Sequence, residues 1–285
     1  MSSTPTSSSI ASAALPMRRL PLAVAALLLG ALLLRLTEAD LPLFLGLNTW
    51  AAGLPETLWS GLSVLGLGLS IGLVGLALSP GRERGAMRLI NALMWAFPLG
   101  GLLSHVPKRL FVQLRPPGVL PPEQLHVIGD PLVHLAMPSG HALAAVAFVW
   151  VVLHTRRCSA AQRALLWGMA AAVALSRIAV GAHWPSDVLA GAALGLVAAA
   201  LSLRAAHRWD LSGLLTRRRA QAVMAVVQLG AGLAMLWTAT GYPLGAPVQW
   251  ALGLAGVAGG LLRLRRVVVT AVSGRRSGWM AERAG

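Results

Sequence analysis

The sequence has 285 residues, of which 56% are hydrophobic and only 12% are charged. Together with a mean hydropathy of +0.69, this composition is typical of an integral membrane protein and excludes an ordinary soluble domain. The net charge of +15 does not indicate a nucleic-acid-binding protein, because the arginines lie between apolar runs without interleaved aromatic residues. Cys158 is the only cysteine, which excludes a disulfide framework and a cysteine-rich metal site.

The first 19 residues are rich in Ser and Thr and end in Arg18-Arg19, directly before an apolar run over 20–36. A basic segment followed by an apolar one is also the pattern of a secretory signal peptide. The run ends in Arg35-Leu36-Thr37-Glu38 with no small-residue cleavage site. We therefore expect a disordered cytoplasmic segment over 1–19 and an uncleaved first transmembrane helix after it.

Further apolar runs follow the first, and each is near the ~20 residues that a helix needs to cross a membrane. The pattern predicts an all-α, polytopic membrane bundle of about eight transmembrane helices, with both termini on one side. The additional runs cover 57–79, 89–106, 138–155, 163–182, 184–204, 221–240 and 246–263.

The loops between these runs sort by charge. With a cytoplasmic N-terminus, the cytoplasmic segments hold 19 of the 24 basic residues, as the positive-inside rule requires. The opposite side keeps six of the nine acidic residues, which are Glu38, Asp40, Glu56, Glu123, Asp130 and Asp187. The basic residues left on that outer side are Arg35, Lys108, Arg109, Arg115 and Arg177.

Three polar clusters coincide with these outer loops, and the first contains Lys108 and Arg115-Pro116. Lys108 is the only lysine in the chain, and its compact ammonium suits a point contact with phosphate, although a lysine at a helix end also simply snorkels to the interface. The prolines after Arg115 stiffen the loop and favour a fixed guanidinium fork for phosphate oxygens. An Arg-Pro pair alone is weak evidence for such a site.

The second cluster is Pro138-Ser139-Gly140-His141, at the start of an apolar run. Ser139 suits the N-cap of a helix, and Gly140 allows close approach of the backbone, so the free N–H groups of the first turn form an anion site. His141 is expected beside the bound anion. An ordinary capped helix with an interfacial histidine is the alternative.

The third cluster combines Arg177, His183 and Asp187. The last two are four residues apart at a helix start, so they share one face, and the carboxylate holds one imidazole nitrogen protonated while the other attacks. A structural hydrogen-bonded pair and a pair of metal ligands are the alternatives. A metal would need a third protein ligand, which no nearby group supplies by its spacing.

Together the clusters resemble the type 2 phosphatidic acid phosphatase superfamily, whose signature is K-x6-RP, PSGH and SR-x5-H-x3-D. The signature is complete here, as Lys108-x6-Arg115-Pro116, Pro138-Ser139-Gly140-His141 and Ser176-Arg177-x5-His183-x3-Asp187. The resemblance covers about 40–204 and implies a six-helix core. We expect a membrane phosphatase domain over 20–204. Two additional transmembrane helices over 205–270, which lie outside the resemblance and have no assigned role, and a basic cytoplasmic tail over 271–285 are expected to follow it.

The resemblance also implies the roles of the residues. His183 would be the nucleophile that forms a phosphohistidine, Asp187 would orient it, and His141 would protonate the leaving oxygen and later activate water. Lys108, Arg115 and Arg177, with Ser139 and the Gly140 backbone, would bind the phosphoryl oxygens. Neither a metal nor another cofactor is implied.

Several polar and aromatic residues match no motif position. We expect His105 and His134 to be interfacial polar residues near the outer site, and Trp50, Trp59 and Trp184 to be anchors in the aromatic belt.

The substrate expected for a site at the outer membrane surface is a lipid with its phosphate at the headgroup level. Undecaprenyl diphosphate is favoured, because that lipid needs recycling on the outer face. Phosphatidylglycerophosphate, phosphatidate and a lipid A phosphate are alternatives. A vanadium haloperoxidase, expected to be soluble, and a non-catalytic lipid-binding or transport protein are the rivals from other classes.

Overall fold

The computed structural model describes the backbone of residues 17–282 and the side chains of 17–269. Within these residues every regular element is a helix. The segment 1–16 of the predicted disordered terminus lies outside the described residues, as do the side chains of the predicted tail 271–285. The α-helices are α1 (Leu20–Leu36), α2 (Asp40–Ala52), α3 (Glu56–Leu65), α4 (Gly68–Ala77), α5 (Arg84–Phe111), α6 (Gly140–Thr155), α7 (Ala160–Ala179), α8 (Pro185–Arg208), α9 (Ser212–Leu215), α10 (Arg218–Trp237) and α11 (Ala246–Glu282).

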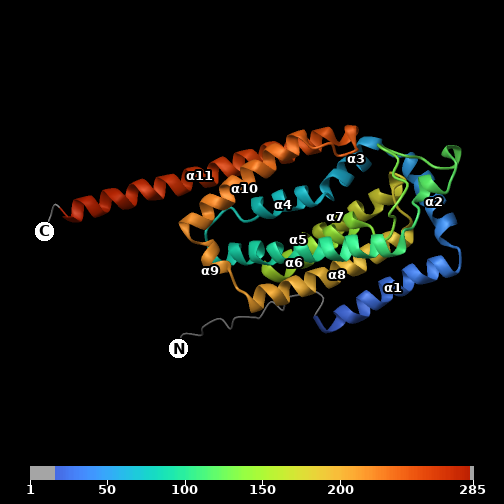
Figure 1. Ribbon diagram of the computed structural model, residues 1–285, viewed down its shortest axis with the longest axis horizontal. Coiled ribbons are helices and arrows are strands. Elements are labelled where there is room, and N and C mark those ends of the chain that lie inside the picture. The colour runs from blue at the N-terminus through green and yellow to red at the C-terminus, as the bar shows by residue number, and fades with distance from the viewer. Residues whose placement is uncertain (1–16, 283–285) are drawn as a thin grey trace, which may run out of the picture.

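Each predicted apolar run forms a helix or, for 57–79, the helix pair α3 and α4, which bends by 71° at its break. Helix α2 was not predicted, because its polar start and Pro42 hide its apolar residues. Figure 1 shows α2 lying across the end of the bundle, at an angle to the long helices. The predicted all-α membrane bundle is confirmed.

Four helical segments of the described chain are long and apolar enough to cross a membrane, or five if the bent pair α3–α4 counts as one span. Helix α6 has only 16 residues, and α7 carries Arg163 and Arg177 near its two ends, which lowers its apolar character. The number of eight spans therefore stays a prediction.

Helix α8 is the centre of the bundle and packs against α1, α5 and α6. Two glycines allow its close approach to α6. A Cβ at Gly191 would lie 2.4 Å from the Ser139 carbonyl oxygen, and one at Gly195 would lie 2.5 Å from that of Leu143. Since Ser139 and the start of α8 belong to two different polar clusters, this contact joins the second cluster to the third.

The hairpin of α10 and α11 packs along α3 and α4 (Figure 1). Among the described side chains of the hairpin, the most buried cation is Arg263 of α11, which donates to the Ser79 carbonyl oxygen (2.6 Å) and to Gln221 Oε1 (2.8 Å). These hydrogen bonds offset the free-energy cost of burying a charge among apolar helices.

Hydrogen bonds between loops define two ends of the bundle. At one end, Arg82 donates to Thr216, Arg84 to Asp210 and Arg156 to Leu78. At the other end, Arg35 contacts Asp187, Asn48 donates to the His126 carbonyl, and Asp130 donates to the Gly241 carbonyl. We call these the arginine end and the motif end. They correspond to the two loop sets predicted from charge.

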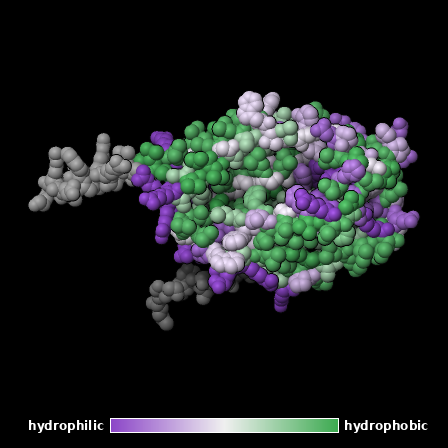
Figure 2. Space-filling view, viewed as in Figure 1, coloured by the Kyte–Doolittle hydropathy of each residue, from purple (hydrophilic) through white to green (hydrophobic). Residues whose placement is uncertain are grey.

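The surface between the ends is apolar. Figure 2 shows hydrophobic residues over most of the middle of this face, with hydrophilic ones gathered toward its ends. Exposed side chains of this kind include Leu29 and Leu32 of α1 and Val223, Val226 and Val227 of α10. In water such a surface would be strongly unfavourable, whereas in lipid it is the expected exterior.

Two of the three predicted belt tryptophans are instead buried. Trp59 and Trp184 are 3% and 8% exposed, and their indole N–H groups donate to the carbonyls of Ala51 and Leu114, both at 2.9 Å. The prediction was wrong for these two because their indoles pack among α2, α3 and the loop after α5, where main-chain acceptors are within reach. Trp50 is 55% exposed, as a belt residue should be.

Candidate active site

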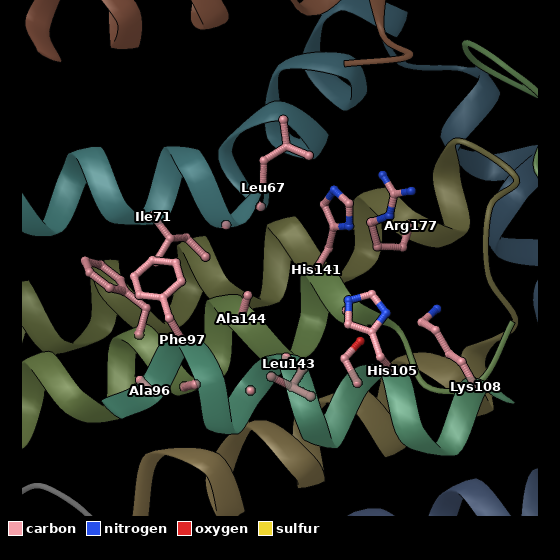
Figure 3. Close-up of a pocket in the computed structure, with 18 of the residues that line it drawn as sticks. Leu67, Ile71, Ala96, Phe97, His105, Lys108, His141, Leu143, Ala144 and Arg177 are labelled. Atoms are coloured by element: carbon pink, nitrogen blue, oxygen red, sulfur yellow. The ribbon is translucent and has the colours of Figure 1, made fainter. Parts of the chain in front are cut away.

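A cavity of about 500 Å³ opens between α4, α5 and α6 near the motif end. Figure 3 shows that its polar side chains, including Lys108, His141 and Arg177, gather at one end, while Ile71 and Phe97 lie at the other. Six of the eight predicted site residues line it, namely Lys108, Arg115, Gly140, His141, Arg177 and His183. Ser139 and Asp187, both 0% exposed, are not among the lining residues.

A tight turn after α7 brings Arg177 and His183 together. The Arg177 carbonyl accepts hydrogen bonds from the backbone N–H groups of Ala182 (3.0 Å) and His183 (3.1 Å). Gly181 has φ +73°, and a Cβ there would lie 2.9 Å from the His126 carbonyl oxygen. A residue with a side chain would be strained at this position, so the six-residue spacing of the two functional groups depends on glycine.

The His183 ring lies between a carboxylate and a guanidinium. Its Nδ1 is 3.4 Å from Asp187 Oδ2, and its Nε2 is 3.2 Å from Arg115 Nη1. The carboxylate favours a proton on Nδ1, which leaves a lone pair on Nε2 at the cavity side. Burial, followed by the charges of Arg115 and Arg177, holds the pKa of His183 well below its ordinary value of 6.5. The neutral imidazole is therefore favoured at neutral pH, and this is the form whose lone pair can act as a nucleophile.

Asp187 is held by more partners than the motif alone indicates. Its Oδ2 accepts the Trp184 backbone N–H (3.0 Å), and its Oδ1 accepts a hydrogen bond from Arg35 Nη2 (2.8 Å). The Arg35 Nε also donates to Ser186 Oγ at 2.9 Å. Asp40 Oδ1 accepts the Ser186 backbone N–H at 2.9 Å, which ties α2 to the start of α8.

The sequence reasoning did not include Arg35 and Asp40 in the site. A signal for Arg35 existed, since it is one of the five basic residues on the predicted outer side. No comparable signal existed for Asp40, because its partner Ser186 is 146 residues away and no sequence motif links the two.

The second cluster lies at the N-terminus of α6 as predicted. Ser139 is the N-cap residue, but its side chain makes no capping hydrogen bond, in contrast to the prediction; instead its backbone N–H donates to the Asp187 carbonyl (2.9 Å). Ser139 Oγ and His141 Nε2 are buried atoms that have no hydrogen-bond partner among the described residues. A Cβ at Gly140 would lie 3.1 Å from Ser104 Oγ, so the glycine permits a close approach of α6 to α5.

Lys108 and Arg115 are both nearly buried, at 9% and 8% exposure. Lys108 therefore does not snorkel away from the cluster, and its Nζ donates to the Leu135 carbonyl at 2.8 Å. Arg115 donates to the carbonyls of His134 (2.7 Å), Leu135 (3.2 Å) and Ala182 (3.0 Å). The guanidinium is thus fixed in the loop, with Nη1 directed to His183.

Arg177 is 1% exposed and is the deepest cation of the site. Its Nη2 donates to the Tyr242 hydroxyl at 2.7 Å, whereas Nε and Nη1 have no partner among the described residues. Tyr242 belongs to the connection between α10 and α11. The pair of additional helices, to which the sequence assigned no role, therefore reaches the site.

His105 was expected to be an interfacial polar residue, but it also lines the cavity. His134 contributes its carbonyl to Arg115. No group of three or more His, Cys, Asp and Glu side chains among the described residues has the arrangement of a metal site.

Two comparisons relate parts of this chain to known proteins. The family model of the PAP2 superfamily matches residues 89–210, which include all eight predicted site residues. The match begins after the first four helices, whereas the resemblance was expected from about residue 40. It also ends before α10 and α11.

A crystal structure of LpxE from Aquifex aeolicus is similar to this chain, with 27% sequence identity and a TM-score of 0.47. The likeness covers 57% of this chain and 94% of that one. No curated protein matches the chain.

Proposed function

Since the family model of the PAP2 superfamily matches residues 89–210, we propose that this protein hydrolyses the phosphate ester or diphosphate of a membrane lipid. The observation that carries the proposal is the cavity itself. Its lining includes three cations and three histidines, and the end away from Lys108 and Arg177 is formed by apolar side chains such as Ile71 and Phe97. A phosphate with a long hydrocarbon tail has this same division of polarity.

In the first step, His183 Nε2 attacks phosphorus and the bond from phosphorus to the lipid oxygen breaks. His141 gives its proton to that oxygen, so the lipid leaves as an alcohol, or as a monophosphate if the substrate is a diphosphate. Asp187 keeps Nδ1 of His183 protonated and stabilises the positive charge of the phosphohistidine.

In the second step, His141 takes a proton from water, and the water oxygen attacks phosphorus. The bond from phosphorus to His183 Nε2 breaks, and inorganic phosphate is released. Lys108, Arg115 and Arg177, with Ser139 Oγ and the Gly140 N–H, stabilise the charge on the phosphoryl oxygens in both steps. The proposal involves no metal.

The favoured substrate is undecaprenyl diphosphate, with the site on the outer face of the cytoplasmic membrane and both termini in the cytoplasm. The loop charges support this orientation, because the arginine end would then face the cytoplasm. The apolar part of the cavity supports a substrate with a long chain. Phosphatidylglycerophosphate, phosphatidate and a lipid A phosphate fit the same chemistry and are the alternatives.

The test is a phosphate-release assay of the purified, detergent-solubilised protein on these four lipids, with and without EDTA. We expect release from at least one lipid, undecaprenyl diphosphate fastest, and no effect of EDTA. Release from none would overturn the proposal in favour of a non-catalytic lipid-binding or transport protein.

A further inference from the structure

The hairpin of α10 and α11 lies outside the match to the superfamily, yet its connection contributes a side chain to the site. We propose that Tyr242 is a positioning residue, which holds the guanidinium of Arg177 in place so that its unpaired N–H groups are available to the phosphoryl group. This inference rests on the proposed function of the cavity. It also assigns a task to helices that the superfamily motifs leave unexplained.

The first step of the argument is how Tyr242 holds the guanidinium. The phenol oxygen accepts a hydrogen bond from Arg177 Nη2 at 2.7 Å, and Cζ of the same guanidinium lies 5.2 Å from the centre of the tyrosine ring. Two contacts with one rigid side chain restrain both the position and the plane of the fork. No other described side chain donates to or accepts from Arg177.

The second step is what this orientation leaves available. With Nη2 occupied by Tyr242, the Arg177 atoms without a partner among the described residues are Nε and Nη1, and both are buried. These two nitrogens do not share an edge of the guanidinium, because the Nε–H lies on the same edge as Nη2, so each is available as a separate single donor to a phosphoryl oxygen. Arg177 lines the cavity together with His141 and His183, and Figure 3 shows it near His141.

The third step is that Tyr242 is itself fixed. It is 6% exposed, and its backbone N–H donates to Thr240 Oγ1 at 3.2 Å. Next to it, the Gly241 carbonyl accepts the Asp130 N–H (3.2 Å), and a Cβ at Gly129 would lie 2.0 Å from that carbonyl oxygen. The loop before α6 and the α10–α11 connection therefore pack closely, and this packing restrains the position of the Tyr242 side chain.

The α10–α11 connection also packs on α3. The Gly245 backbone approaches so closely that a Cβ there would lie 2.9 Å from the Ser60 carbonyl oxygen. The hairpin is thus docked on both sides of Tyr242, by α3 and by the loop over 126–130. This close packing lets a residue outside the match to the superfamily position a cation of the site.

The experiment compares wild type with Tyr242→Phe, which removes the hydroxyl and keeps the ring, and with Tyr242→Leu, which removes both. For Tyr242→Phe we expect kcat/KM on the best lipid substrate to fall about tenfold, because one hydrogen bond to a charged group is lost. Weaker competitive inhibition by inorganic phosphate, without a change in the thermal unfolding midpoint, should accompany the fall. Tyr242→Leu should lose more, since the ring contact is also removed.

The matched control is Gln249→Leu, because Gln249 holds the same hairpin through the carbonyls of Met235 (2.7 Å) and Thr238 (2.8 Å) without touching Arg177. It should lower the unfolding midpoint and leave phosphate inhibition as in wild type. The second control is Tyr242→Phe in an Arg177→Lys background. There the hydroxyl should contribute nothing further, since its effect passes through the guanidinium.

The inference is overturned if Tyr242→Phe keeps wild-type kcat/KM and phosphate inhibition, or if its effect is undiminished in the Arg177→Lys background. An effect of Tyr242→Phe that merely equals that of Gln249→Leu would also overturn it, because the role would then be structural. These outcomes are distinct from failure of the proposed function, in which the wild-type protein itself releases no phosphate.

Discussion

Arg35 at the end of α1 and Asp187 at the start of α8 form a 2.8 Å ion pair across 152 residues of sequence. The carboxylate is completely buried, whereas the side chain of Arg35 is 30% exposed. Because an isolated buried carboxylate is strongly unfavourable, Arg35 supports the ionised form of Asp187 that the proposed chemistry requires. The first helix thereby becomes part of the site, although it lies outside the match to the superfamily.

Replacement of Arg35 tests this relationship. For Arg35→Leu we expect kcat on the best lipid substrate to fall at least about tenfold, since the charge-assisted hydrogen bond to Asp187 is lost. Arg35→Lys should recover part of the loss. The control is Arg109→Leu, which removes an exposed cation from the same end of the bundle and should leave kcat unchanged. Equal activities of Arg35→Leu and wild type would contradict the role of the ion pair.

Substitution of His183 tests the nucleophile. His183→Ala should reduce phosphate release at least about a thousandfold, and acid-quenched samples of wild type with ³²P-labelled substrate should carry a label that this variant lacks. His207→Ala, in an exposed position at the opposite end of α8, is the matched control. Label that persists in His183→Ala would assign the phosphohistidine to another residue.

Titration of His183 follows from its lowered pKa. Burial and the neighbouring cations destabilise the protonated ring, so the free enzyme should keep His183 neutral as the pH falls through 6.5 and protonate it only well below that value. NMR of ¹⁵N-histidine-labelled protein, with the signal assigned by its loss in His183→Gln, measures the midpoint. A midpoint at or above 6.5 would be inconsistent with this electrostatic environment.

Filling the apolar part of the cavity tests its role in binding a lipid chain. Ala144 of α6 lines this part, and Ala144→Phe should lower kcat/KM for a long-chain lipid about tenfold or more, because the added ring occupies the space of several methylene groups. Hydrolysis of a short, water-soluble phosphate ester should be unaffected. Ala171→Phe, on the exposed face of α7, is the control. Equal losses on both substrates would show that the variant disturbs the phosphate site instead.

Cysteine labelling tests the proposed orientation. In a Cys158→Ser background, Glu123→Cys places a thiol in the exposed loop at the motif end, and an impermeant maleimide should label it in intact cells. The native Cys158, in the connection between α6 and α7 at the arginine end, should react only after lysis. The reverse pattern would invert the topology and place the site on the cytoplasmic face.

Much of this protein follows from its sequence alone. Apolar runs of membrane-spanning length predicted the helices, because in lipid the backbone must satisfy its own hydrogen bonds and helices do so within each segment. The charges of the loops predicted which loops lie at the same end of the bundle. The three motif clusters contained the six predicted residues that line the cavity. These features are local, or depend on spacing along a short stretch of chain.

Only the tertiary structure decided which distant residues complete the site. Arg35 contacts Asp187 from α1, Tyr242 contacts Arg177 from the α10–α11 connection, and Trp184 is buried rather than interfacial. No periodicity relates these pairs, because each depends on how helices far apart in the sequence pack around α8. The close approach of α6 and α8 at Gly191 also depends on packing. The sequence shows only that the residue is small, whereas the tertiary structure shows that the Ser139 backbone occupies the space beside it.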